Sequence, residues 1–92
     1  MVNAIILLNI EYPHVGEVAQ KLAAESGVTQ VYSVAGQYDL VAHARVESNE
    51  ALAQLVTERV ATLRGIRSSE TLIAFRVYSS GELEAAFEVG VD

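Results

Sequence analysis

The chain has 92 residues, twelve acidic and six basic side chains, a formal net charge of −6 and no cysteine. One domain is expected at this length, and the acidic balance argues against direct nucleic-acid binding, which needs clustered Lys and Arg. The absence of cysteine excludes disulfides and zinc–thiolate sites, and it fits a cytoplasmic protein. No apolar run in the sequence is long enough to span a membrane.

The first half of the chain predicts a strand, a helix and a second strand. Residues 2–10 are almost continuously apolar, as in a central strand covered on both faces. Pro13 suits the first turn of a helix, and Gly27 suits the left-handed position that ends it. Residues 28–35 mix apolar and polar side chains and therefore predict an edge strand. The apolar positions of the helix have helical spacing: Val15, Val18, Ala19, Leu22 and Ala23.

The second half repeats this order after a turn. Gly36 and the following Gln37 predict a tight hairpin that leads into a strand over residues 38–46. Ser48 or Asn49 is expected to cap the second helix. The apolar stripe of this helix consists of Leu52, Leu55, Val56, Val60 and Leu63.

The last predicted strand follows Gly65 and covers residues 66–78. Its residues Thr71, Ile73, Phe75 and Val77 share one face because they alternate. We take residues 1–78 as the domain and residues 79–92 as an acidic tail, for which a short helix capped by Ser80 is favoured over a fully extended end.

Two βαβ units joined by a hairpin predict an α+β, ferredoxin-like βαββαβ fold with an antiparallel sheet in the order 4-1-3-2. Both helices then lie on one face, although the two central strands carry apolar residues on both sides. We therefore expect the bare face to be covered by a second copy, with the sheets of a dimer paired face to face in a sandwich about 10 Å thick. The alternative is that the acidic tail folds back over its own sheet.

The sequence shows no convincing catalytic or metal-binding constellation, so we expect neither an enzyme nor a cofactor. His14 is expected to be solvated near a helix start, and His43, beside Arg45, to be a packing or interface residue. Glu47 and Glu50 favourably meet the dipole at the start of the second helix. The two histidines belong to different elements and lack metal-ligand spacing.

The remaining unusual cluster is at the hairpin and at the start of the last strand. Asp39 could hold an ammonium group, while the hydroxyls of Ser69 and Thr71, with freed backbone N–H groups, could hold a carboxylate. Each residue also has a purely structural interpretation: a turn for Gly36 and Asp39, cross-strand packing for Tyr38, and strand propensity for Thr71. Because the two groups stand on different strands, we expect them to meet across a contact between subunits.

Two motifs in this chain carry a family resemblance. The segment GVTQVYSVAGQYDLVAHARVESNEALAQLV, followed by LRGIRSSETLIAF, resembles the effector domain of the leucine-responsive/asparagine (Lrp/AsnC) family of prokaryotic transcription regulators. That domain is called RAM, for regulation of amino-acid metabolism. The resemblance covers roughly residues 4–77. The most specific features are the Gly-Gln-Tyr-Asp hairpin and the Gly-Ile…Ser-Glu-Thr run.

The resemblance implies a ferredoxin-like domain that dimerises through its sheets, often assembles into an octamer, and binds amino acids or related metabolites between dimers. By position, Gly36, Tyr38 and Asp39 match the hairpin motif of the family. Ser69 and Thr71 match its hydroxyl positions, with Ser69 where threonine is often found.

The chain departs from full-length family members because it starts at the first strand of the RAM domain, without a helix-turn-helix module. It resembles the stand-alone version, and regulation would then be indirect, through metabolite sensing or through mixed assemblies with full-length Lrp/AsnC proteins. The target genes and the identity of the effector stay open.

Two other classes of function stay open as well. A small dimeric α/β-barrel enzyme, such as a cofactor-free monooxygenase, would need a roomy pocket between sheet and helices, and the small Ala42 and Ala44 leave room for one beside His43. A purely structural assembly module would bind no ligand.

Overall fold

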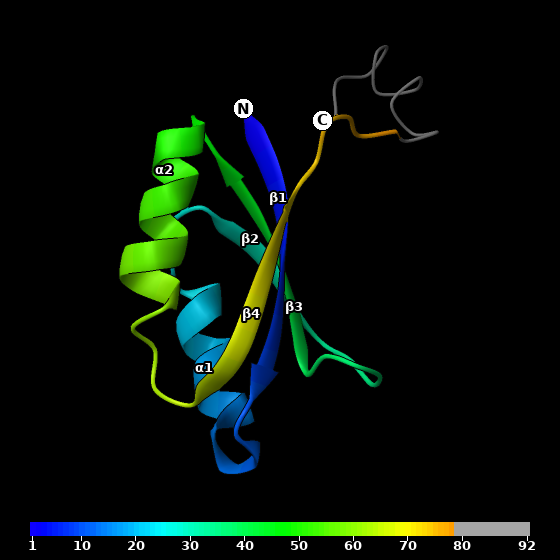
Figure 1. The fold of residues 1–92 in the computed structure, drawn as a ribbon, viewed down its shortest axis with the longest axis vertical. Helices are drawn as coiled ribbons and strands as arrows, with labels where there is room; N and C mark the ends of the chain where they lie inside the picture. The colour runs from blue at the N-terminus through cyan, green and yellow to red at the C-terminus, as the bar shows by residue number, and fades with distance from the viewer. Residues whose placement is uncertain (79–92) are drawn as a thin grey trace.

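The computed structural model describes residues 1–78 and shows a four-stranded antiparallel sheet with both helices on one face (Figure 1). The strands lie in the order β2-β3-β1-β4, which confirms the predicted ferredoxin-like topology with β1 and β3 at the centre. Within this part of the chain, no helix is long and apolar enough to cross a membrane. The predicted tail helix, with its cap at Ser80, lies outside the described residues. The strands are β1 (Val2–Ile10), β2 (Val28–Ser33), β3 (Leu40–Val46) and β4 (Ile66–Ile73).

The core forms where the helices cover the sheet. Alternate residues of the central strands are buried because successive side chains of a strand point to opposite faces. They meet the apolar positions of the helices, as the spacing predicted. The buried set is Ala4, Ile6, Leu8, Ile10, Val18, Leu22, Leu40, Ala42, Ala44, Val46, Leu52, Leu55 and Val60.

The first helix begins with a 3₁₀ turn, η1 (Tyr12–His14), which contains Pro13 and continues directly into α1 (Val15–Ala23). Proline is tolerated there because its missing N–H group would have no partner in a first turn. Val18 and Leu22 of α1 are buried against the sheet. The predicted helix is therefore confirmed, with its start at the turn that contains Pro13.

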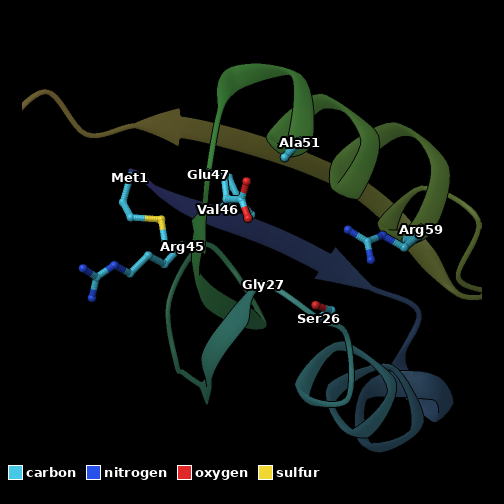
Figure 2. Close-up of a pocket in the computed structure, with 8 residues that line it drawn as sticks. All are labelled: Met1, Ser26, Gly27, Arg45, Val46, Glu47, Ala51 and Arg59. Atoms are coloured by element: carbon cyan, nitrogen blue, oxygen red, sulfur yellow. The ribbon is translucent and has the colours of Figure 1, made fainter.

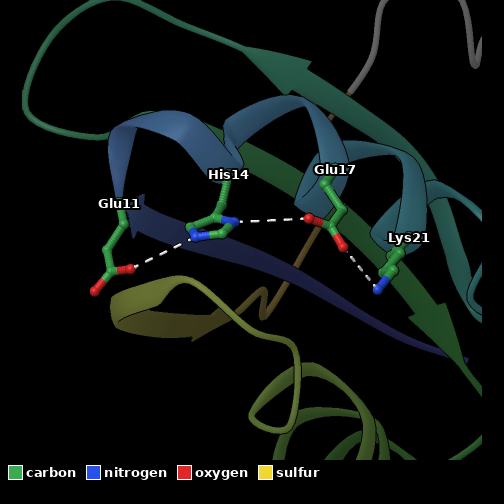
Figure 3. A network of polar contacts seen from close by, with 4 residues as sticks. All are labelled: Glu11, His14, Glu17 and Lys21. Carbon is green, nitrogen blue, oxygen red and sulfur yellow. Dashed lines mark ion pairs between the residues drawn. The ribbon is translucent and has the colours of Figure 1, made fainter.

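A row of charged side chains runs along the outside of this helix (Figure 3). The Nζ atom of Lys21 lies 3.0 Å from a carboxylate oxygen of Glu17, whose other oxygen is 3.6 Å from Nδ1 of His14. Nε2 of His14 lies 3.9 Å from Glu11. His14 is thus half-buried and joined to two carboxylates, rather than simply solvated as expected.

The Lys21 ammonium holds the pKa of Glu17 below its ordinary value of 4.5, first by hydrogen bonding and then by its charge, with the contact to His14 adding to the effect. A carboxyl group whose pKa is lower in the folded state stabilises the fold above its unfolded pKa. That contribution is lost as the pH falls through the folded value. Because these side chains are exposed, solvent screens the contribution strongly.

The second helix changes geometry halfway. Ser48 caps α2 (Asn49–Gln54), since its hydroxyl oxygen accepts a 3.0 Å hydrogen bond from the N–H of Ala51. The chain then continues as a π-helical segment, η2 (Leu55–Val60), which the sequence did not predict. Leu55 and Val60 are both buried, and the wider π turn brings residues five apart onto the same side. Both ends of the π-helical segment therefore contribute a side chain to the core.

Three strand boundaries differ from the prediction: the end of β2, the start of β3 and the end of β4. The connection between β2 and β3 is a loop over residues 34–39, closed by a 3.1 Å hydrogen bond from the N–H of Val34 to the carbonyl of Asp39, rather than a tight turn at Gly36 and Gln37. β4 ends at Ile73 instead of residue 78, because Ile73 pairs with Ala4 near the start of β1 and few partner residues lie beyond it. Phe75, which follows, is 99% exposed.

Candidate functional site

Within residues 1–78, nothing covers the face of the sheet opposite the helices. In β1 and β3, residues that alternate with the buried ones point to this side, and the strand register brings them together. We call this surface the open face. Its residues are Asn3, Ile5, Leu7, Asn9, Gln30, Tyr32, Val41, His43, Arg45, Ser68, Glu70 and Leu72.

The centre of the open face is apolar. Leu7 of β1 lies directly opposite Val41 of β3, and Tyr32 lies opposite Val41 on the other side. Ile5 lies opposite Leu72, which remains 46% exposed, while Tyr32 is 49% exposed. A contiguous apolar surface of this kind marks an interaction site. The expectation of apolar side chains on both faces of the central strands is confirmed, whereas the arrangement of two such faces in a dimer stays a prediction.

A short polar chain crosses the open face beside this apolar centre. Nε2 of His43 lies 3.0 Å from Oδ1 of Asn3, and its Nδ1 is hydrogen-bonded to the hydroxyl of Thr29. Thr29 reaches this face because the pairing of β2 with β3 shifts between Val28 and Gln30. The Thr29 hydroxyl also donates a 3.1 Å hydrogen bond to the backbone carbonyl of His43. His43 therefore has intramolecular partners for both nitrogens.

This placement removes the basis for an enzyme pocket beside His43. Ala42 and Ala44 are fully buried in the core, on the helix side of β3. His43 lies between them in sequence and points to the open face. The two small residues and the imidazole thus face opposite sides of the sheet and cannot line one cavity between sheet and helices.

Asp39 ties the hairpin loop to the end of β1. Its backbone N–H donates to the carbonyl of Leu8 at 2.9 Å, and its Oδ2 accepts a 2.8 Å hydrogen bond from the N–H of Ile10. The side chain therefore performs the structural role that was considered for it, although toward β1 instead of within the turn. Gly36, at the tip of the loop, has a φ of +144° and open space around its Cα, so that a glycine is favoured there.

Tyr38 reaches across the end of β1 to β4. Its hydroxyl donates a 3.0 Å hydrogen bond to the carboxylate of Glu70 on the open face. This hydrogen bond, together with the negative charge of Glu70, raises the pKa of Tyr38 above its ordinary value of 10.0. The structure thus connects the hairpin loop with β4 inside one protomer, through Glu70, which belongs to the cluster at the start of the last predicted strand but was not assigned a ligand role. The only signal was an acidic residue between the two hydroxyl candidates.

Replacing Glu70 by glutamine should lower the pKa of Tyr38 toward 10.0, because the carboxylate charge no longer opposes formation of the phenolate. Because the pKa of Tyr38 is higher in the folded state than in the unfolded state, the protonated phenol stabilises the fold below its unfolded pKa. This stabilisation is lost as the pH rises through the folded pKa. An ultraviolet titration of the tyrosines, with Tyr38→Phe to identify the relevant one, measures the change. Glu58→Gln serves as the control, because it removes a carboxylate elsewhere on the surface. If Tyr38 titrates at the same pH in Glu70→Gln and in the native chain, Glu70 does not raise the pKa of Tyr38.

Ser69 and Thr71 lie on the helix side of β4, where they pair with Leu8 and Ile6. Thr71, with Ile73, lines an apolar groove of about 240 Å³ between β4 and α2. The other lining residues of this groove are Asn49, Leu52, Ala53, Val56 and Thr57. The two hydroxyl candidates are therefore on the opposite side of the sheet from Glu70.

The predicted cluster is thus only partly assembled in one protomer. Leu8 of β1 pairs with Leu40 on one side and with Ser69 on the other. Since Leu40 follows Asp39, the hairpin end of β3 is separated from Ser69 by one strand, which corresponds to about 10 Å. Tyr38 turns instead to Glu70. Whether a second copy completes a ligand site from Gly36, Tyr38, Asp39, Ser69 and Thr71 stays a prediction.

Comparison with known proteins shows similarity to one domain of transcriptional regulators. Residues 3–83 match the family described as "Lrp/AsnC ligand binding domain". The HTH-type transcriptional regulator FL11 of Pyrococcus furiosus is 29% identical over 75 residues, which cover 82% of this chain and 49% of that regulator. The chain thus spans about half the length of this curated relative.

Solved structures show the same fold. The protein TTHA0845 from Thermus thermophilus is 38% identical, and the match covers 86% of this chain and 99% of that one with a TM-score of 0.82. The transcriptional regulator NMB0573 from Neisseria meningitidis, solved as a complex with L-Met, is 14% identical; the match covers 82% of this chain and 50% of that one, with a TM-score of 0.75. At that identity the likeness shows a shared fold alone.

Proposed function

The chain belongs to the family of Lrp/AsnC ligand-binding domains, and we propose on this basis that it is an amino-acid-responsive assembly module in transcription regulation. The members of this family are transcription regulators and not enzymes. The proposed module binds an amino acid or a related metabolite, and the bound state changes how copies of the domain associate. The family match over residues 3–83 is the observation that carries this conclusion.

The open face supports the assembly part of the proposal. A partner would bury its apolar centre around Leu7 and Val41, and a second copy offers the same surface in a two-fold arrangement. Two sheets packed in this way form a sandwich. Further association into an octamer, and mixed assembly with full-length Lrp/AsnC proteins, extend the same proposal.

The hairpin loop and the hydroxyls of β4 are the proposed ligand residues. The bond from the N–H of Ile10 uses Oδ2 of Asp39, which leaves Oδ1 as an acceptor for an ammonium group. Ser69 and Thr71 offer hydroxyl donors to a carboxylate. A carboxylate on one side and hydroxyl donors on the other suit a zwitterion such as an amino acid.

Regulation through this domain is proposed to be indirect. The net charge of −6 disfavours contact with DNA phosphates, so the domain acts through its assembly partners. A cytoplasmic location follows from a role in prokaryotic transcription.

A thermal shift screen against the twenty L-amino acids tests this function. A ligand at 100 times its Kd should stabilise the fold by about 2.7 kcal/mol. Asp39→Asn should abolish most of the shift, because it removes the charge that holds the ammonium while keeping an oxygen for the N–H of Ile10. Glu58→Gln, an exposed site with the same change in charge, is the matched control. If no amino acid shifts the midpoint of the native chain, the proposal of amino-acid sensing fails.

A purely structural assembly module is the second candidate. The observation in its favour is that Tyr38 and Asp39 already have partners within the protomer, Glu70 and Ile10. In that case light scattering would show one unchanged assembly with and without pooled amino acids.

A further inference from the structure

A second cavity lies at the end of β3 that is opposite to the hairpin loop, and Met1 and Arg45 are among the residues that line it (Figure 2). It has a volume of about 420 Å³ and forms where the end of β3 meets the connection between α1 and β2 and the inner side of the second helix. Small-molecule sites have volumes of about 300–1,000 Å³. Its lining includes Ser26, Gly27, Val46, Glu47, Ala51 and Arg59, all from one protomer.

Two opposite charges lie on different sides of this cavity. The guanidinium of Arg59 points into it from the second helix, and the carboxylate of Glu47 lies at the end of β3 (Figure 2). Within residues 1–78, these two groups form no ion pair with each other; Arg59 pairs instead with Glu25, at 3.6 Å. The guanidinium of Arg45, by contrast, points away from the cavity (Figure 2).

This arrangement selects for a ligand that carries both charges. A simple anion attracted by Arg59 would be repelled by Glu47, and a simple cation would be repelled by Arg59. A zwitterion satisfies both, since a guanidinium pairs well with a carboxylate and a carboxylate accepts hydrogen bonds from an ammonium.

We propose that this cavity binds a free α-amino acid, with the ligand's carboxylate on Arg59 and its ammonium on Glu47. The hydroxyl of Ser26 can donate to the ligand's carboxylate, and Val46 and Ala51 offer an apolar wall for a small aliphatic side chain. This assignment rests on the proposed function for the class of ligand and adds a binding site that is separate from the hairpin loop. Because one protomer supplies every group, binding here needs no second copy.

The experiment combines ligand analogues with two pairs of matched variants. The best binder among the twenty L-amino acids is compared by calorimetry with its amide, which lacks the carboxylate, and with its deaminated acid, which lacks the ammonium. Glu47→Gln and Arg59→Gln remove the two charges of the cavity, while Glu58→Gln and Arg64→Gln make the same changes at exposed positions outside it. Circular dichroism checks that each variant is folded.

We expect both analogues to bind at least roughly tenfold more weakly than the amino acid, since each loses a charge-assisted hydrogen bond. Glu47→Gln and Arg59→Gln should weaken binding to a similar degree, and the two controls should bind as the native chain does. Glu47→Gln is the cleaner variant, because Arg59→Gln also removes the pair with Glu25.

Asp39→Asn separates this inference from the proposed function. Binding that is lost in Asp39→Asn but unchanged in Glu47→Gln and Arg59→Gln overturns the inference and leaves the hairpin site standing. Binding that is lost in the two cavity variants but kept in Asp39→Asn supports it and moves the ligand away from the hairpin. Two binding events per chain, each removed by its own variant, support both sites. If none of the twenty amino acids binds, both are overturned.

Discussion

Replacing Leu7 with lysine is expected to keep the chain monomeric, whereas the native chain is expected to assemble through its open face. Leu7 lies at the apolar centre of the open face, opposite Val41 and next to the row that contains Ile5 and Leu72. In a face-to-face dimer its side chain would be buried, and two-fold symmetry would introduce the charge twice. Burying an unpaired ammonium costs several kcal/mol, so the association constant should fall at least about 100-fold.

Light scattering and sedimentation over a range of protein concentrations measure this change. Gln54→Lys, on the exposed side of α2, adds the same charge without touching the open face and should leave the assembly as it is. Circular dichroism should show that the Leu7→Lys monomer keeps its secondary structure, because the core faces the other side of the sheet. A Leu7→Lys protein that assembles as the native chain does would show that another surface, or the acidic tail, covers the sheet.

Replacing Gly65 with alanine is expected to lower the free energy of unfolding by about 2 kcal/mol or more. Gly65 has a φ of +99°, where a side chain strains the backbone. A Cβ built there would lie 2.6 Å from Cβ of His14 and 2.8 Å from its Cγ. The backbone is also held in place, since the carbonyl of Gly65 accepts a 2.7 Å hydrogen bond from the N–H of Glu11. The turn before β4 therefore has little freedom to move away from η1.

Chemical denaturation measures this loss, and Gly16→Ala provides the opposite control. Gly16 lies in α1, and a methyl group added to its Cα would meet nothing within 4 Å, so alanine should stabilise the helix by up to about 1 kcal/mol. Adding His14→Ala to Gly65→Ala should recover part of the loss by relieving the contact, while the strain in φ remains. Equal stability of Gly65→Ala and the native chain would mean that this turn can rearrange at no cost.

The hairpin loop illustrates why a local pattern did not decide a boundary. Gly36 and Gln37 are typical of a tight turn, and Gly36 does have a positive φ. The turn is nevertheless longer, because Asp39 bonds to Leu8 and Ile10 of β1, residues about thirty positions away in the chain. A window of neighbouring residues contains no information about that partner.

The candidate sites depend on tertiary structure even more strongly. The hairpin motif and the hydroxyl run were visible in the sequence, but the side of the sheet on which each lies follows from the register of β4 with β1. That register turns Ser69 and Thr71 toward the helices and leaves Glu70 for Tyr38. The cavity between Glu47 and Arg59 had no sequence signal, because the segments that line it are adjacent only after folding.

The order of strands and helices, the core positions and the positive φ of Gly27 and Gly65 could be predicted from the sequence alone. These features depend on spacing along the chain, and a period of two or of 3.6 residues is a local property. The prediction that these glycines end the helices was wrong, because α1 ends at Ala23 and the second helix at Val60, and both glycines lie directly before the next strand. The π-helical segment, the early end of β4, the Tyr38–Glu70 bond and the charged cavity were decided only by the tertiary structure. Each of them depends on a partner from a distant part of the chain, and the packing of that partner determines the local geometry.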